Sequence, residues 1–274
     1  MDIEEARQLA KDETTSPKLL AELADSEDRE TRRSVAANPN TSIKTLLKLG
    51  FEFQEEFLNN PILDLLILEN PNFIDRNYYL QIELAKNPQT STNFLKYLME
   101  YGRYGIREYL AMHPNISIEM LNKMAETAIK KSISGDKTVI AIANNLKTST
   151  YILEKLLTYW NNIKIDPVFF RDDSINCQIK LGISLASHPN TSESVLRYLI
   201  TSKRKEIILS VVKNTKTSEF ILKSIACRKD CTSTIAKEIT KHPNFSQAVL
   251  KMLAIRGHSN IVKTYINKNY EIDN

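Results

Sequence analysis

A five-residue element recurs along the chain and separates one apolar stretch from the next. It begins with Asn or His, Pro usually follows, and its last residue is usually Ser. Clear copies begin at Asn38, Asn87, His113 and His188, and looser copies begin at Asp12, Asn60, Asn145, Asn214 and His242. Repetition at a spacing of roughly 20–50 residues is typical of proteins built from stacked units, so this element constrains the fold more than any other feature.

The last residue of the element is expected to begin a helix. Ser and Asp side chains accept a hydrogen bond from the free amides of a helix's first turn, so we predict helix N-caps at Ser16, Ser42, Asp64, Ser91, Ser117, Ser149, Ser192, Ser218 and Ser246. The third, fourth and seventh residues after each cap are apolar almost throughout, as in an amphipathic helix. The fourth is always Leu and is predicted to be buried: Leu20, Leu46, Leu68, Leu95, Leu121, Leu153, Leu196, Leu222 and Leu250.

A second helix is expected to end where the element begins. Apolar pairs such as Val35-Ala36 and Leu185-Ala186 precede the Asn or His. Asn tolerates the left-handed backbone conformation that ends many helices, and Pro cannot continue a helix. Two such short helices can bury their apolar faces only against neighbouring units. We therefore predict an all-α fold, an α-solenoid of about nine two-helix repeats that forms a single domain over residues 1–274.

Segments 31–41 (TRRSVAANPNT) and 106–114 (IREYLAMHP) resemble the leucine-rich repeat variant family, whose units place a similar Val-Ala-x-Asn-Pro element before a Leu-rich helix. The resemblance implies a right-handed superhelix, in the style of HEAT repeats, in which α-helices alternate with short 3-10 helices. The family's founding architecture also has an N-terminal four-cysteine iron–sulfur segment. The first cysteine here is Cys177, so we expect no such cofactor.

The longest spacing between elements, from Ser149 to His188, indicates an insertion at about residues 158–180. Insertions in repeat proteins often lie on the binding face, and aromatic residues and Arg anchor many interfaces. We predict contacts with a protein partner through Trp160, Phe169, Phe170 and Arg171. The alternative is that the rings fill the core where the repeat is interrupted. No metal or catalytic site is predicted, because no His or second carboxylate lies at motif spacing from Asp166, Asp172 and Asp173.

Charge is distributed unevenly along the chain. Residues 1–100 hold 11 Lys+Arg and 18 Asp+Glu, whereas residues 101–274 hold 26 and 15. In the repeat register, two columns of basic residues align in the C-terminal units: Arg197, Lys223 and Lys251 in one, and Lys213, Lys241 and Lys268 in the other. Such columns suit an acidic protein surface or a nucleic acid. The alternative is a solvated face whose lysines favour the helix dipole.

The remaining features argue against chemistry and against a membrane. His113, His188 and His242 occupy the position that Asn fills elsewhere, and no glycine-rich phosphate loop is present. We expect no small-molecule substrate, no metal and no cofactor. No apolar run is long enough to cross a membrane, and three cysteines fit a reducing compartment, so we predict a soluble, cytoplasmic protein.

The sequence favours a non-catalytic repeat scaffold that binds another protein. The alternative is nucleic-acid binding through the basic face of the C-terminal repeats. A third possibility, an enzyme of the HEAT-like DNA glycosylase type with an acid such as Asp172, is supported only by analogy of fold.

Overall fold

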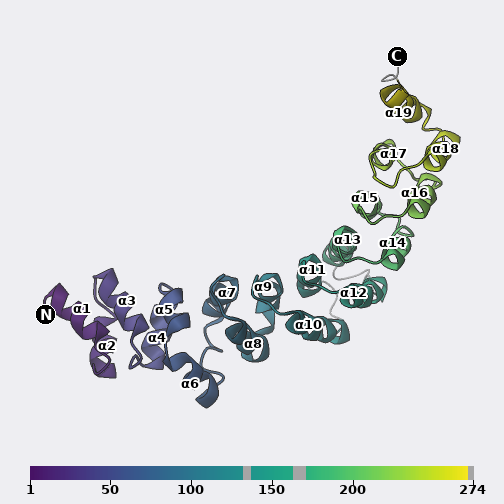
Figure 1. Ribbon diagram of the computed structural model, residues 1–274. Coiled ribbons are helices and arrows are strands. Elements are labelled where there is room, and N and C mark those ends of the chain that lie inside the picture. Colours follow the sequence, from purple (N-terminus) through teal and green to yellow (C-terminus); the bar gives the residue numbers. More distant parts are fainter. Residues whose placement is uncertain (132–136, 163–170, 271–274) are drawn as a thin grey trace. The chain divides into compact units, whose positions relative to one another are not determined.

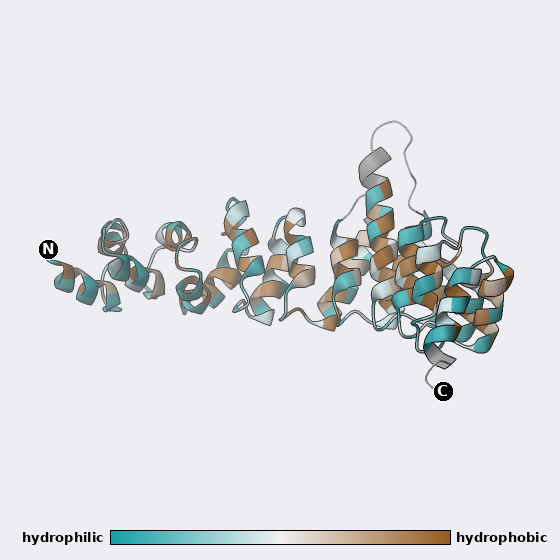
Figure 2. Ribbon diagram, turned by 90° about the horizontal axis from the view of Figure 1, so that it is seen from above, coloured by the Kyte–Doolittle hydropathy of each residue, from teal (hydrophilic) through white to brown (hydrophobic). Residues whose placement is uncertain are grey.

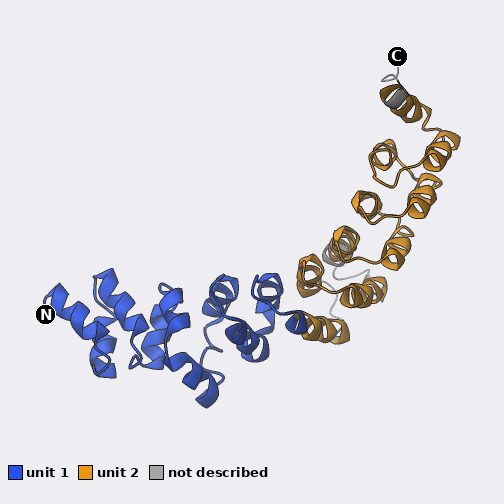
Figure 3. Ribbon diagram, in the orientation of Figure 1, with its two compact units in different colours: residues 1–120 blue, residues 121–274 orange. Residues whose placement is uncertain are grey.

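The computed structural model describes residues 1–131, 137–162 and 171–270, and within these ranges the chain is helical and contains no strand. The prediction of an all-α fold is therefore confirmed. The chain divides into two compact units, residues 1–120 and 121–274, which are described separately below (Figure 3).

Unit 1 contains short helices joined by short turns. Its helices are α1 (Ile3–Lys11), α2 (Pro17–Leu23), α3 (Arg29–Ala37), α4 (Ile43–Leu49), α5 (Gln54–Asn59), α6 (Ile62–Glu69), α7 (Tyr78–Lys86), α8 (Thr92–Tyr101), the 3-10 helix η1 (Tyr104–Ile106) and α9 (Arg107–Met112). The division between the units falls within α10 (Ile118–Lys131).

Unit 2 continues the pattern with helices of more varied length. They are α11 (Lys137–Asn144), α12 (Thr150–Asn162), α13 (Arg171–Ser187), α14 (Glu193–Leu199), α15 (Lys205–Lys213), α16 (Glu219–Ala226), α17 (Ser233–Ile239), α18 (Gln247–Ile255) and α19 (Ser259–Tyr270). Apart from η1, all helices in the described ranges are α-helices, so the alternation with 3-10 helices implied by the family resemblance is not observed there.

Odd- and even-numbered helices form two rows within each unit (Figure 1). In unit 1, α1 contacts α3, α3 contacts α5, and α7 contacts α9. In unit 2, α13 packs between α11 and α15, while α12 contacts α14 and α16 contacts α18 in the other row. Most helices carry both hydrophobic and hydrophilic residues (Figure 2), as expected of elements that bury one face.

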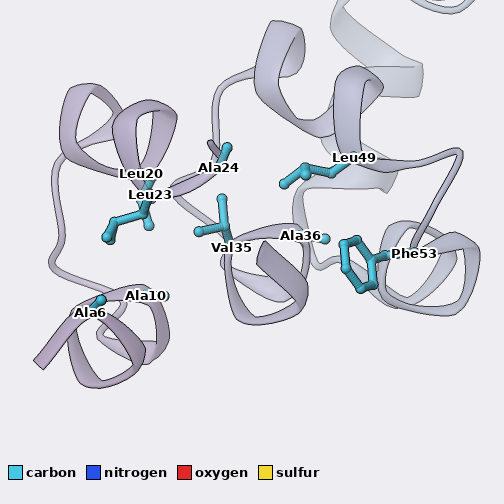
Figure 4. Packing of buried hydrophobic residues seen from close by; sticks show 9 residues of the cluster. All are labelled: Ala6, Ala10, Leu20, Leu23, Ala24, Val35, Ala36, Leu49 and Phe53. Carbon is cyan, nitrogen blue, oxygen red and sulfur yellow. The ribbon is translucent and has the colours of Figure 1, made fainter. Parts of the chain in front are cut away.

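The predicted caps are confirmed at all eight serines. Each Ser Oγ accepts the backbone N–H of the third residue along, as Ser117 does from Met120 at 3.1 Å. The leucine four residues after each serine is buried. Figure 4 shows how this builds a core in unit 1, where Leu20 and Leu23 of α2 lie close to Val35 of α3.

The third predicted copy is wrong. Asp64 is not an N-cap, because α6 begins at Ile62, directly after Pro61. The register shifts accordingly, so that Leu63 and Leu66 are buried, whereas Leu68 is 79% exposed. The residues after Asn60-Pro61 include no Ser or Thr that could delay the start of the helix.

The residue that opens each element is called here the corner residue: Asn38, Asn60, Asn87, His113, Asn145, His188, Asn214 and His242. The predicted left-handed conformation is wrong where the backbone of these residues is given. Asn38 has φ −73° and ψ 127°, and His113 has φ −69° and ψ 136°. A proline follows most corner residues, disfavours the helical region and promotes this extended conformation. Asn214, which is followed by Thr215, adopts it without a proline.

Corner asparagines join successive repeats by hydrogen bonds. Asn38 Nδ2 donates to the carbonyl oxygens of Ala10 and Asp12, both at 2.9 Å, in the preceding repeat. Its Oδ1 accepts the backbone N–H of Asn40 at 2.9 Å. The same set of bonds is made by Asn60 and Asn214. One buried amide therefore satisfies backbone groups of two repeats.

Corner histidines make the same connection with a ring. His188 Nε2 lies 2.9 Å from the carbonyl oxygen of Asn145, and Nδ1 accepts the backbone N–H of Asn190 at 3.0 Å. His113 and His242 have the same arrangement. Because Nδ1 accepts a hydrogen bond, the ring must be neutral with its hydrogen on Nε2.

Two further positions of the element reinforce several corners. The Asn two residues after a corner histidine also bonds the preceding repeat, as when Asn115 Nδ2 donates to the carbonyl oxygens of Pro88 and Thr90, both at 3.0 Å. The next residue is often a buried Thr whose hydroxyl donates to the carbonyl oxygen six residues earlier, at Thr15, Thr41, Thr90, Thr148, Thr191 and Thr217.

The described part of the predicted insertion is helical. Residues 158–162 end α12 and residues 171–180 begin α13, while residues 163–170 lie outside the described ranges. Much of the extra length therefore extends two helices that contact each other.

The buried corner residue His188 is expected to make the stability of the folded chain depend on pH. Burial lowers the pKa of His188, so the folded chain binds this proton less readily than the unfolded chain, whose histidine titrates near about 6.5. Stability from this group is complete above that pH and falls as the pH decreases, by at most about 1.4 kcal/mol per pH unit. In urea titrations, we expect His188→Asn to remove this loss, because Asn fills the corner elsewhere.

His188→Ala is the control for that measurement. Relative to His188→Asn, it leaves the N–H of Asn190 without its acceptor and should cost about 1–3 kcal/mol in unfolding free energy at both pH 8 and pH 5, because neither variant titrates at this position. Parallel stability profiles for the wild-type chain and His188→Asn between pH 8 and pH 5 would contradict the prediction.

Candidate interaction surfaces

The first predicted basic column consists of cations that are mostly paired. Arg197 on α14 contacts Glu193 at 2.9 Å, and Lys223 on α16 contacts Glu219 at 2.8 Å, each one helical turn away. Lys251 on α18 is exposed, and the residue equivalent to these glutamates is the uncharged Gln247. Two of the three cations are thus locally neutralised.

The two glutamates also connect neighbouring repeats. Glu193 accepts the hydroxyl of Ser218 at 2.8 Å, and Glu219 accepts that of Ser246 at 2.6 Å. The pKa of Glu193 is lowered by Ser218 and then by Arg197, and the pKa of Glu219 is lowered by Lys223 and then by Ser246. Both carboxylates therefore remain ionised at neutral pH and compensate the adjacent cations.

Exposed aromatic rings lie beside cations on the even-numbered helices of unit 2. Arg197 lies 4.5 Å from the ring centre of Phe220, and Lys155 lies 4.4 Å from that of Tyr151. The rings are 56% and 57% exposed, and Tyr198 on α14 is 38% exposed. Tyr151, Tyr198 and Phe220 are called here the outer aromatic row. Cation–π contacts of this kind hold a charged group and a ring in a fixed arrangement.

Sequence reasoning missed the outer aromatic row. A signal was present, because Tyr151 and Phe220 both stand two residues after a cap serine, and a helix directs that position away from the buried third and fourth residues. The predicted aromatic site was placed in the insertion instead.

Trp160 is a packing residue. Its ring is 7% exposed, and Nε1 donates to the carbonyl oxygen of Gln178 on α13 at 2.7 Å. The edge of the ring also meets Tyr198, with ring centres 6.3 Å apart. A Cβ added to Gly182 would lie 2.6 Å from Ile207 Cδ1 and 3.0 Å from Trp160 Nε1, so the glycine leaves room for both side chains. Trp160 thus joins α12, α13 and α14 and presents little surface to a partner.

The side chains of the other three residues predicted to contact a partner lie outside the described part of the structure. Phe169 and Phe170 lie outside the described residues. Arg171 is the first residue of α13, and its side chain likewise lies outside the description. These three predictions therefore stay predictions.

The second basic column is brought together only in part. Lys241 contacts Glu238 at 2.7 Å, and both Lys241 and Lys268 line a pocket of about 550 Å³ between α17 and α19. Lys213, at the end of α15, is exposed and does not line it. The pocket, called here the terminal pocket, is lined by Lys237, Thr240, Lys241, Asn260, Ile261, Thr264, Tyr265 and Lys268.

Groups with the chemistry of a catalytic or metal site are few in the described residues. They include no group of three His, Cys, Asp or Glu side chains that could hold a metal ion. Burial raises the pKa of Cys231 to about 11, so this thiol is not activated as a nucleophile. None of the described helices combines the length and apolar character needed to span a bilayer.

Comparisons with protein-family models, curated proteins and solved structures gave no significant match.

The packing role of Trp160 is testable because it is the chain's only tryptophan. We expect its fluorescence in the folded chain to resist quenching by acrylamide. Trp160→Ala should lower the free energy of unfolding by about 3–5 kcal/mol, because it leaves a cavity between helices. The matched control, Tyr151→Ala, removes an exposed ring and should cost less than about 1 kcal/mol. Quenching as efficient as that of free tryptophan would contradict the assignment.

Proposed function

We propose that the chain is an α-solenoid of about nine two-helix repeats, of the leucine-rich repeat variant type, and that it acts as a non-catalytic scaffold binding a protein partner. Support for the repeat comes from the eight serine caps and from the corner bonds that connect successive units. A backbone held by such bonds at six of the eight corners keeps surface side chains at fixed spacings, which suits an extended recognition surface.

The observation that carries the binding proposal is the outer aromatic row. Phe220 is more than half exposed although it belongs to a helix with a well-buried apolar face, and Arg197 covers part of its ring. Aromatic residues and Arg contribute a large share of the energy of protein interfaces. Because the Arg197–Glu193 pair holds the guanidinium in place, part of its ordering entropy is lost before a partner binds.

Nucleic-acid binding is the second candidate function, and the pairing of cations disfavours it for the first column. Affinity for phosphates comes from cations that replace condensed counterions. Arg197 and Lys223 already contact carboxylates, which reduces the positive field that they offer. An enzyme of the glycosylase type is not proposed, because the side chain of Asp172 lies outside the described residues.

Site-specific photo-crosslinking tests the proposed surface. A photo-reactive phenylalanine analogue at Phe220 should capture one discrete partner in the cells that produce the chain, to be identified by mass spectrometry. The same analogue at Tyr79, a 76% exposed ring in unit 1, is the control and should not capture that partner. Equal capture from both positions, or none from Phe220, would contradict the proposal.

Once the partner is identified, substitutions test how much each side chain contributes to the binding free energy. Phe220→Ala and Arg197→Ala should each weaken binding about tenfold or more, corresponding to about 1.4 kcal/mol, with little change in melting temperature. Leu146→Ala, which removes an apolar side chain of unit 2 that is more exposed than Phe220, should leave the dissociation constant unchanged. Loss of binding with Leu146→Ala but not with Phe220→Ala would move the site elsewhere.

For the second candidate, gel retardation of single- and double-stranded DNA and RNA at about 50 mM salt is decisive. We expect no retardation. A shift that disappears between about 50 and 200 mM salt, and that is lost when Lys251 and Lys268 are replaced by Glu, would favour nucleic-acid binding instead.

A further inference from the structure

We propose that the terminal pocket binds an acidic peptide segment of the partner protein. The inference rests on the function proposed above and adds the chemistry of one recognised segment. The pocket lies between α17 and α19, away from the outer aromatic row on α12, α14 and α16, so that a partner could be held at two places within unit 2.

The charge of the pocket selects an anion. Lys237 lies in the last turn of α17, Lys241 follows two residues after the end of that helix, and Lys268 lies on α19. Among the described residues that line the pocket, none is acidic. Glu238, beside the pocket, contacts Lys241 at 2.7 Å and compensates one of the three positive charges. Lys237 and Lys268 are exposed and are therefore available to the carboxylates of a peptide.

The polar groups between the lysines suit a peptide backbone. Thr240 Oγ1 donates to the carbonyl oxygen of Lys237 at 2.9 Å, and Thr264 Oγ1 donates to that of Asn260 at 2.8 Å. Each hydroxyl has thus used its hydrogen and retains oxygen lone pairs, which can accept N–H groups. A peptide supplies such donors at every residue, together with acidic side chains for the lysines, whereas a phosphodiester backbone supplies none.

The ring and the aliphatic group in the pocket also favour a peptide as the ligand. Tyr265 makes an edge-to-face contact with Phe245, with ring centres 4.9 Å apart, and is partly exposed. Ile261, which also lines the pocket, is partly exposed and offers apolar surface for an aliphatic side chain. Acidic residues that flank an aliphatic residue match this set of groups.

A fluorescein-labelled peptide, acetyl-Glu-Asp-Leu-Glu-Asp-amide, tests the inference with the full chain by fluorescence anisotropy. We expect saturable binding that weakens as salt is raised, and at least tenfold weaker binding for the isosteric neutral peptide Gln-Asn-Leu-Gln-Asn. The triple variant Lys237→Gln, Lys241→Gln, Lys268→Gln should also lose at least tenfold. The matched double variant Lys213→Gln, Lys251→Gln changes exposed lysines outside the pocket and should bind as the wild-type chain does.

Three outcomes would overturn the inference: equal binding of the neutral peptide, full binding by the triple variant while circular dichroism confirms its fold, or displacement of the peptide by short single-stranded DNA at lower concentration than by unlabelled peptide. The result separates this inference from the proposed function. A partner captured at Phe220 without peptide binding rejects only the terminal pocket, whereas peptide binding without capture rejects only the outer aromatic row.

Discussion

The interaction on which the repeat depends is a side chain that bonds backbone groups of two repeats at once. At Asn38 and Asn214 a single amide donates to carbonyl oxygens of the preceding corner and accepts an N–H of its own corner. Buried backbone groups that lack partners cost about 1–3 kcal/mol each, so these bonds stabilise a turn that would otherwise need water. They also define the position of each helix relative to the equivalent helix before it.

This constraint explains which residues can occupy the corner. Asn and neutral His both place a donor and an acceptor on opposite sides of a short planar group, whereas Asp lacks the donor and Lys lacks the acceptor. Asn214 and His242 occupy equivalent corners and therefore make equivalent hydrogen bonds, although the two side chains differ in size. Histidine is a common catalytic and metal-binding residue, but the three corner histidines have both ring nitrogens engaged by the backbone.

Local signals in the sequence predicted the helices well, and contacts between elements limited the rest. Ser caps and the buried leucines four residues later follow from bonds within one helix, and they hold wherever a serine is present. The register failed at Asp64 because the short third element begins its helix at Ile62. Nothing local to the motif indicated that Asn38 would reach back to Ala10, since that bond depends on the stacking itself.

The same limit applied to the candidate surfaces. Glu193 and Glu219 stand four residues before Arg197 and Lys223, so these two ion pairs could be predicted from the sequence. The bonds of the two glutamates to Ser218 and Ser246 of the following helices could not. Trp160 was considered both as a contact residue and as core, and its bond to Gln178 on another helix places it in the core. By contrast, the exposed positions of Tyr151 and Phe220 were accessible from helical periodicity alone.

The most direct test of the corner bonds is nitrogen-15 NMR of the histidine side chains at about pH 8, where neutral rings reveal which nitrogen carries the hydrogen. The account predicts that His113, His188 and His242 are each fixed as the Nε2–H tautomer, with Nδ1 as an acceptor, and that His258, outside the corners, serves as the internal comparison. Signals showing an Nδ1–H tautomer, or a rapidly averaged mixture, at the three corners would contradict it.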